Sequence, residues 1–210
     1  GKTIPAQAIS LFKAGNYNRV PLLVGYNRDE ATVFALVPGI SIASNQQQFE
    51  AGLDKFMPAL KEDFLAAYEP GLGEMERQPY LDFWRDMVFG WNMQTWARLN
   101  EQGGDRSWMY FFTHQPPTTL GERLGVYHGA EIAYVFGNRL PNTKDDRDLS
   151  DLMQCYWVNF ATFGTPNGPG AEIWPNFGKH GRYLQIGLPE ALGQKLDADA
   201  MSVWDKAAGL

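Results

Sequence analysis

The sequence is poor in cysteine, since Cys155 is the only one among its 210 residues. No disulfide can therefore form within the chain, and a zinc or iron–sulfur site built from several cysteines is excluded. No apolar run approaches the roughly 20 residues that a membrane-spanning helix requires. Basic residues do not cluster and the net charge is −6, which argues against a nucleic-acid partner. The compartment stays open, because proteins without disulfides occur in the cytoplasm as well as among periplasmic or secreted proteins.

Apolar residues are abundant, and their patterns predict an α/β fold. Three continuous apolar runs are typical of strands buried on both faces, as in a parallel sheet: Arg19–Tyr26, Ser107–His114 and Arg182–Ile186. Helical patterns lie between and after these runs: residues 46–68 with a break at Pro58, Leu81–Gln102, a short helix that ends at Phe136, a helix from about Leu149 to Phe163, and the tail Pro189–Ala208.

Three strands are too few for such a sheet, because a parallel strand as apolar as Val20–Gly25 needs neighbours on both sides and helices on both faces. We therefore expect residues 1–210 to be part of a single domain with no internal boundary. The rest of its sheet is expected to come from polypeptide that precedes Gly1.

Two acidic residues and a histidine follow the first two predicted strands. Asp29 and Glu30 come just after the first strand, and His128 lies in a glycine-rich turn downstream of the second. Because the carboxyl ends of parallel strands meet at one edge of a sheet, a carboxylate and an imidazole from these loops can form an acid–histidine pair. Such a carboxylate fixes the imidazole tautomer and stabilises the imidazolium that forms when histidine takes a proton. His114 and His180 are expected to have structural or solvent-exposed positions.

A nucleophile for this pair is missing from the sequence. None of the serines lies in a Gly-x-Ser-x-Gly turn, which would present a reactive hydroxyl between a strand and a helix. In α/β-hydrolases the chain order is serine, then acid, then histidine. With Glu30 ahead of His128, this order places the expected serine upstream of Gly1.

Several blocks of the sequence resemble the C-terminal part of the type-B carboxylesterase family, which includes carboxylesterases, cholinesterases and bacterial p-nitrobenzyl-type esterases. They include "RVPLLVGYNRDEATVF", "WMYFFTH", "GVYHGAEIAYVFG", "YWVNFATFGTPNG" and "IWPNF", in family order. The resemblance implies the C-terminal portion of an α/β-hydrolase fold and favours Glu30 over Asp29 as the triad acid, with His128 as the base. It also implies that a missing N-terminal portion, the partner of this chain, supplies the serine and the oxyanion hole. The expected activity is hydrolysis of a small-molecule carboxylic ester by acyl transfer to water, with no metal or organic cofactor.

Two departures from the family pattern narrow the expected type of family member and its expected substrates. Cholinesterase-like members link the long helix to the C-terminal helix by a disulfide; neither region has a cysteine here, which favours a bacterial-type member. The segment "ATVF" lacks the paired aromatic residues that cholinesterases use against a quaternary ammonium group, so choline esters are not expected as substrates. Phe34 remains, either as a wall of the substrate pocket or as part of the core.

Glu131, three residues after His128, has two interpretations. It is either a buried carboxylate that hydrogen-bonds near the acid–histidine pair or an acidic residue at a helix start. Two alternatives to an esterase also stay open: a catalytically silent, cholinesterase-like adhesion or binding domain, and an inactive C-terminal fragment without a partner. The serine, if present upstream, separates the first of these from the enzyme.

Overall fold

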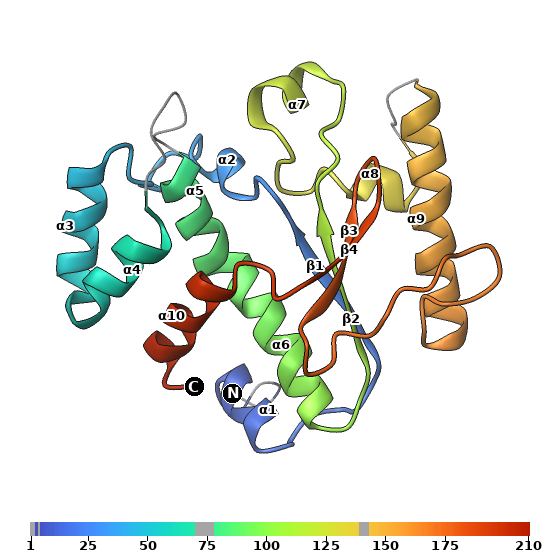
Figure 1. Ribbon diagram of the computed structural model, residues 1–210, viewed down its shortest axis with the longest axis horizontal. Helices are drawn as coiled ribbons and strands as arrows, with labels where there is room; N and C mark the ends of the chain where they lie inside the picture. Colours follow the sequence, from blue (N-terminus) through green and yellow to red (C-terminus); the bar gives the residue numbers. More distant parts are fainter. Residues whose placement is uncertain (1–2, 4, 70–77, 139–142) are drawn as a thin grey trace.

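The computed structural model describes residues 3, 5–69, 78–138 and 143–210. Its centre is a four-stranded sheet with the order β1-β2-β3-β4 (Figure 1). The first three strands are parallel and the fourth is antiparallel to its neighbour: β1 (Leu22–Asn27), β2 (Ser107–Phe112), β3 (Arg182–Ile186) and β4 (Ala191–Gln194). The predicted parallel sheet is therefore confirmed, and the three predicted strands lie where their apolar runs placed them.

The register of the sheet brings the carboxyl ends of the parallel strands to one level. Asn27, the last residue of β1, is opposite Phe112, the last residue of β2, and Phe112 is in turn opposite Ile186 at the end of β3. Loops that leave these strands therefore start side by side. This edge is where α/β sheets place their reactive groups.

Helices cover both faces of the sheet, and the side chains of β2 alternate between them. Trp108 and Phe112 pack in a cluster with α8 (Ile132–Val135) and α9 (Lys144–Phe163), whereas Met109 and Phe111 pack toward α6 (Trp91–Gln102) (Figure 1). Burial on both faces explains why the sequence of β2 is continuously apolar rather than alternating.

A further apolar cluster lies to the side of the sheet, between helices. It joins α3 (Gln46–Phe56), η1 (Pro58–Leu60), α4 (Lys61–Ala67), α5 (Gln78–Arg85) and α10 (Ala198–Ala208). The predicted break at Pro58 is confirmed. The remaining helices are α1 (Ala8–Lys13), α2 (Ala31–Phe34) and α7 (Thr119–Leu124). Within the described ranges, no helix combines the length and the apolar character needed to cross a membrane.

Three predicted boundaries were wrong. The helix expected over Leu81–Gln102 is divided by a π-helical turn, η2 (Asp86–Gly90), into α5 and α6. Helix α9 begins at Lys144 rather than near Leu149, because the Thr143 side chain accepts a hydrogen bond from the Asp146 N–H and caps the first turn. The tail after Pro189 forms β4 before α10, because pairing with β3 overrides the weak helical pattern there.

Candidate active site

The candidate acid and base lie in two loops at the carboxyl edge of the sheet. Glu30 ends the short turn between β1 and α2, and His128 lies in the loop between α7 and α8. The two loops are joined as a short parallel bridge between Asp29 and Tyr127. Residues that are almost a hundred positions apart in the sequence thus meet at the carboxyl edge of the sheet.

Hydrogen bonds hold the two loops in one arrangement. The Asp29 N–H donates to the Val126 carbonyl (3.0 Å), and the Val126 N–H donates back to Asp29 Oδ2 (2.7 Å). Thr32 Oγ1 donates to the Leu124 carbonyl (2.8 Å). Gly125 permits this closeness, because its φ is +68° and a Cβ there would lie 2.3 Å from Asp29 Oδ2. The relative positions of the acid and the base are therefore set by the backbone.

Glu30 and His128 are in direct contact, with 2.6 Å between Glu30 Oε2 and His128 Nδ1. The other carboxylate oxygen, Oε1, accepts the Asn27 N–H (2.8 Å). An ionised carboxylate only accepts hydrogen bonds, so Nδ1 is the donor in this contact, and in a neutral imidazole Nε2 then keeps its lone pair. The Glu30 side chain is 5% exposed and the imidazole 47% exposed. The contact with Glu30 thus occupies Nδ1. Nε2 belongs to a half-exposed ring and can reach a third group.

Burial and charge act against each other at Glu30. Burial raises the pKa of its carboxyl above the ordinary value, and the nearby Glu131 carboxylate raises it further. The Asn27 N–H and the His128 imidazole oppose this effect by stabilising the ionised form.

Two aromatic rings contact the imidazole of His128. The Phe34 ring lies 5.2 Å from it between centroids, and the Phe89 ring lies 5.0 Å from it. Phe34, predicted from its place after the acid, is thus next to the base. Phe89, which lies in the π-helical turn η2, was not predicted from the sequence. Such turns are frequent at functional sites, but a regular helical pattern gives no sign of one.

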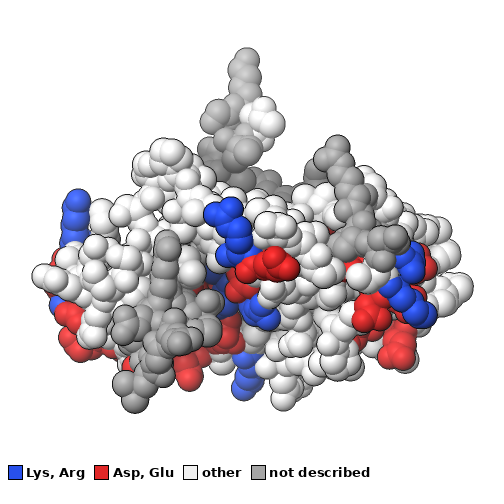
Figure 2. Space-filling view, turned by 90° about the horizontal axis from the view of Figure 1, so that it is seen from above, with Lys and Arg blue, Asp and Glu red and all other residues white. Residues whose placement is uncertain are grey.

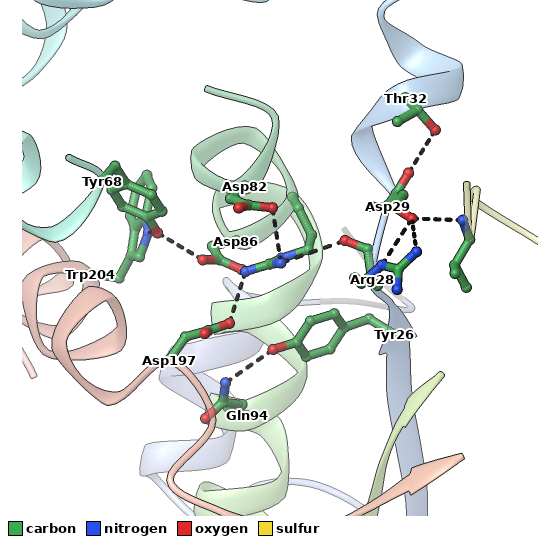
Figure 3. Close-up of polar contacts among 12 residues, drawn as sticks. Tyr26, Arg28, Asp29, Thr32, Tyr68, Asp82, Asp86, Gln94, Asp197 and Trp204 are labelled. Atoms are coloured by element: carbon green, nitrogen blue, oxygen red, sulfur yellow. Dashed lines mark hydrogen bonds and ion pairs between the residues drawn. The ribbon is translucent and has the colours of Figure 1, made fainter. Parts of the chain in front are cut away.

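The carboxylate of Asp29, the alternative acid, forms hydrogen bonds with groups other than His128. In addition to the Val126 N–H, its Oδ2 accepts hydrogen bonds from the Arg28 guanidinium at 3.1 Å (Figure 3). The structure brings Glu30, and not Asp29, against the His128 ring.

Glu131 reaches the same region through Asn27. Its Oε2 accepts a hydrogen bond from Asn27 Nδ2 at 2.5 Å, and the same nitrogen donates to the Tyr127 carbonyl at 2.9 Å. Both interpretations of Glu131 describe part of what is seen: it directly precedes α8 as its N-cap residue, and its half-buried carboxylate contacts Asn27 rather than the N–H groups of that helix. Asn27 was not singled out in the sequence, because a polar residue that ends a strand has no pattern of its own.

An ionic network centred on the buried Arg85 and Asp86, at the junction of α5 and η2, lies beside the turn (Figure 3). The Arg85 guanidinium donates to Asp86 (2.7 Å), Asp82 (3.1 Å) and Asp197 (2.8 Å), and it reaches the Arg28 carbonyl at 3.5 Å. Burial raises the pKa of Asp86 to about 6, against the effect of the adjacent guanidinium. The network anchors the β1–α2 turn to the helical cluster.

The remaining histidines lie apart from this pair. His114 Nε2 contacts Asp146 Oδ1 at 2.9 Å, and His180 is exposed in a turn. Among the described residues, no three His, Cys, Asp or Glu side chains are grouped in a way that could hold a metal ion.

The mostly parallel sheet with helices on both faces is part of an α/β-hydrolase fold. Two solved structures share it: "PNB esterase", with a TM-score of 0.74 and 22% identity over 95% of this chain and 41% of that chain, and "thermophylic PNB esterase", with 0.73 and 20% over the same shares. The sequence model described as "Carboxylesterase family" matches residues 1–204, and the chain belongs to this family.

Several mammalian proteins of known name are similar to the chain. Carboxylesterase 1C of Rattus norvegicus is 28% identical over 97% of this chain and 40% of its own length. Cocaine esterase of Homo sapiens is 28% identical over 99% and 40%, and cholinesterase of Mus musculus is 29% identical over 93% and 36%. The chain thus spans at most 40% of the length of these relatives.

Proposed function

We propose that the chain is the C-terminal part of a serine carboxylester hydrolase, in which Glu30 and His128 are the acid and the base of a Ser-His-Glu triad. The observation that carries this proposal is the 2.6 Å contact between Glu30 Oε2 and His128 Nδ1. It combines a buried acid with a half-exposed imidazole at the carboxyl edge of a parallel sheet. An N-terminal portion outside residues 1–210 supplies the serine and the oxyanion hole; we call the polypeptide that contains both portions the complete enzyme.

The mechanism is acyl transfer through a covalent intermediate. The serine oxygen attacks the ester carbonyl carbon while His128 Nε2 takes its proton, and the Glu30 carboxylate stabilises the resulting imidazolium. His128 then returns the proton to the leaving alcohol, which departs as an acyl-serine forms. Water attacks the acyl-serine by the same route, with His128 as base, and releases the acid. No metal or organic cofactor takes part in these steps.

The surroundings of His128 support an uncharged, apolar ester as the substrate. Phe34 lies between the imidazole and Trp84, with 4.9 Å between the Phe34 and Trp84 ring centroids. Trp84 in turn lines a cavity of about 720 Å³, whose walls include Phe49, Phe83 and Met87. Figure 2 shows uncharged side chains over most of the surface seen from above, with acidic and basic ones interspersed rather than separated by sign. The rings beside His128 and the cavity walls named here carry no charge, so they offer a charged substrate no ion pair.

Substitution of the base in the complete enzyme tests the proposal. We expect p-nitrophenyl butyrate to be hydrolysed, and His128→Ala to lower kcat/KM by at least about 10⁴-fold. His180→Ala is the matched control, because His180 is an exposed histidine in a turn of the same chain. It should leave kcat/KM within about twofold.

Two results would contradict the proposal. Hydrolysis that survives His128→Ala at the unmodified rate removes His128 from the mechanism. A folded complete protein that hydrolyses no ester of any chain length, and whose N-terminal portion has no Gly-x-Ser-x-Gly, would instead be the silent binding domain.

A further inference from the structure

Asn27 occupies a position that a polar side chain rarely has. It is the last residue of β1 and is fully buried, on the face of the sheet opposite to that of its neighbour Tyr26. This face packs against α8 and α9, and the residue paired with Asn27 on β2 is the buried Phe112. Burial of an amide among apolar groups costs free energy unless its polar atoms are paired, so the partners of Asn27 decide what it does.

The Asn27 side chain contacts the His128 loop on both sides of the base. Nδ2 donates to the carbonyl of Tyr127, the residue before His128, at 2.9 Å. The same nitrogen donates to Oε2 of Glu131, three residues after His128, at 2.5 Å. The Asn27 backbone N–H meanwhile donates to Glu30 Oε1 at 2.8 Å. One residue therefore contacts the acid with its backbone and holds the loop of the base with its side chain.

The two acceptors fix the orientation of the amide. A flipped amide would point Oδ1 at the Tyr127 carbonyl and at the Glu131 carboxylate, which both lack a proton to donate. In the observed orientation Oδ1 is buried and, within the described part of the chain, accepts no hydrogen bond. The amide tolerates this unpaired acceptor because the orientation satisfies the Glu131 charge, which also raises the pKa of Glu30.

We propose that Asn27 is a positioning residue of the acid–histidine pair, whose side-chain amide holds Tyr127 and Glu131 so that the His128 imidazole stays against Glu30. This inference rests on the proposed function for its kinetic consequence, but the contact it describes can be measured without activity. An aspartate at position 27 would retain the size of the side chain and lose both donated hydrogen bonds. It would also add a third carboxylate beside Glu30 and Glu131, near two further titratable groups, the Tyr110 hydroxyl and the His128 imidazole.

The experiment compares Asn27→Asp with the double variant Asn27→Asp/Glu131→Gln in the complete enzyme. The single variant should lower kcat for p-nitrophenyl butyrate by about 10- to 100-fold, because a displaced base misses its near-attack geometry, with KM within about twofold. In the double variant the new amide at position 131 can donate to the new carboxylate at position 27. This exchange reverses the direction of the hydrogen bond, and kcat should recover by at least about tenfold. The NMR signal of the His128 Nδ1 proton should shift upfield or be lost by exchange in the single variant and return in the double variant.

Asn100→Asp is the matched control. Asn100 is equally buried, and its Nδ2 donates to Ser107 Oγ at 3.2 Å, at the opposite end of β2. It should leave both kcat and the Nδ1 signal unchanged. If Asn27→Asp does not fold, Asn27→Ser removes the amide without a charge and should give the same change in direction.

The outcomes separate the two proposals. A folded Asn27 variant with an unchanged Nδ1 signal overturns the positioning role, and so does an equal effect of Asn100→Asp, whether or not the wild type is active. A wild type that hydrolyses no ester but loses its Nδ1 signal in Asn27→Asp keeps the positioning role and overturns the proposed function.

Discussion

The described part of the chain has two histidine–carboxylate pairs, and they are built in opposite ways. In the first, His128 uses Nδ1 to contact Glu30, and its imidazole is 47% exposed. In the second, His114 uses Nε2 to contact Asp146, and its imidazole is 14% exposed. In each pair the carboxylate is buried. The pairs thus differ in which ring nitrogen is held and in how open the ring is.

The surroundings explain the difference. Asp146 Oδ1 accepts hydrogen bonds from both His114 and the Tyr134 hydroxyl (2.6 Å), while the Thr143 hydroxyl contacts the other oxygen. The acid is saturated, and the pair ties the end of β2 to the first turn of α9. Around His128, hydrogen bonds join the backbones of the two loops to each other. The contact with Glu30 uses Nδ1, and Nε2 accepts no hydrogen bond from the described residues. A histidine beside an acid is therefore not in itself a reactive site; the choice of nitrogen and the exposure of the ring make the difference.

Replacement of each histidine by phenylalanine gives the largest contrast, because phenylalanine keeps a ring and removes both nitrogens. In the complete enzyme, His128→Phe should lower kcat/KM for p-nitrophenyl butyrate by at least about 10⁴-fold. His114→Phe should leave kcat/KM within about threefold and lower the free energy of unfolding by roughly 1–2 kcal/mol. Steady-state kinetics and urea denaturation measure the two effects. Equal losses of activity in the two variants would show that the pairs are not distinct in role.

The two adjacent acids of the β1–α2 turn give the next largest contrast. Glu30→Gln should lower kcat by about 10²- to 10⁴-fold, because a neutral amide no longer selects the tautomer with its proton on Nδ1. Asp29→Asn keeps an oxygen that can accept the Val126 N–H, so kcat should stay within about threefold and the stability should fall by about 1 kcal/mol. A larger kinetic effect at Asp29 than at Glu30 would reverse the assignment of the acid.

The sheet could be predicted from the sequence because its parallel strands are continuously apolar, as in Ser107–Phe112. The antiparallel strand β4 could not, because Ala191–Gln194 is mostly exposed and pairs only with its neighbour β3. The start of α9 at Lys144 was missed for a similar reason: its first turn is charged, and a single threonine cap defines it. Elements without an apolar face leave little trace in the pattern of hydrophobic residues.

The contact between Glu30 and His128 could be expected because both follow strands that end at the same edge of the sheet. The two residues that complete their surroundings could not. Asn27 acts through the Tyr127 carbonyl and through Glu131, about a hundred residues further along the chain. Phe89 reaches the imidazole from a π-helical turn. Both depend on the tertiary arrangement, which no local pattern encodes.

The contributions of Asp146 and Glu30 to the free energy of unfolding should change with pH in opposite directions. Burial opposes ionisation of Asp146, but hydrogen bonds from Thr143, Tyr134 and His114 outweigh it and lower its pKa below 3.8. This contribution is present above the pKa of the unfolded state and is lost as the pH falls through the lower, folded value. Burial raises the pKa of Glu30 above 4.5, so its contribution is present below 4.5 and is lost as the pH rises through the folded value.

Urea midpoints measured from pH 3 to pH 6 test this contrast. Asp146→Asn should flatten the acid side of the profile, where the wild type loses stability below about pH 4. Glu30→Gln should remove the decline on the other side, as the pH rises above the value for an unfolded glutamate. Identical profiles for the two variants would show that both acids are paired in the same way.

The smallest expected effect concerns the rings around the two histidines. The Phe34 and Phe89 rings lie at 48° and 31° to the His128 ring, whereas the Phe112 and Tyr134 rings meet His114 nearly edge-on, at 71° and 82°. The Phe34 ring contacts both His128 and Trp84. We therefore expect it to contact the substrate.

Phe34→Leu should therefore change the ratio of kcat/KM values for p-nitrophenyl octanoate and acetate by about 3- to 10-fold, with a stability change below about 1.5 kcal/mol. The control is Phe111→Leu, because Phe111 is buried in the sheet against Tyr26 and no ring contact joins it to His128 among the described residues. That variant should lower stability and leave the ratio of the two esters unchanged. If both variants change the ratio equally, Phe34 acts on substrate preference through the packing of the sheet. If only Phe34→Leu does so, the ring that contacts the base also contacts the ester.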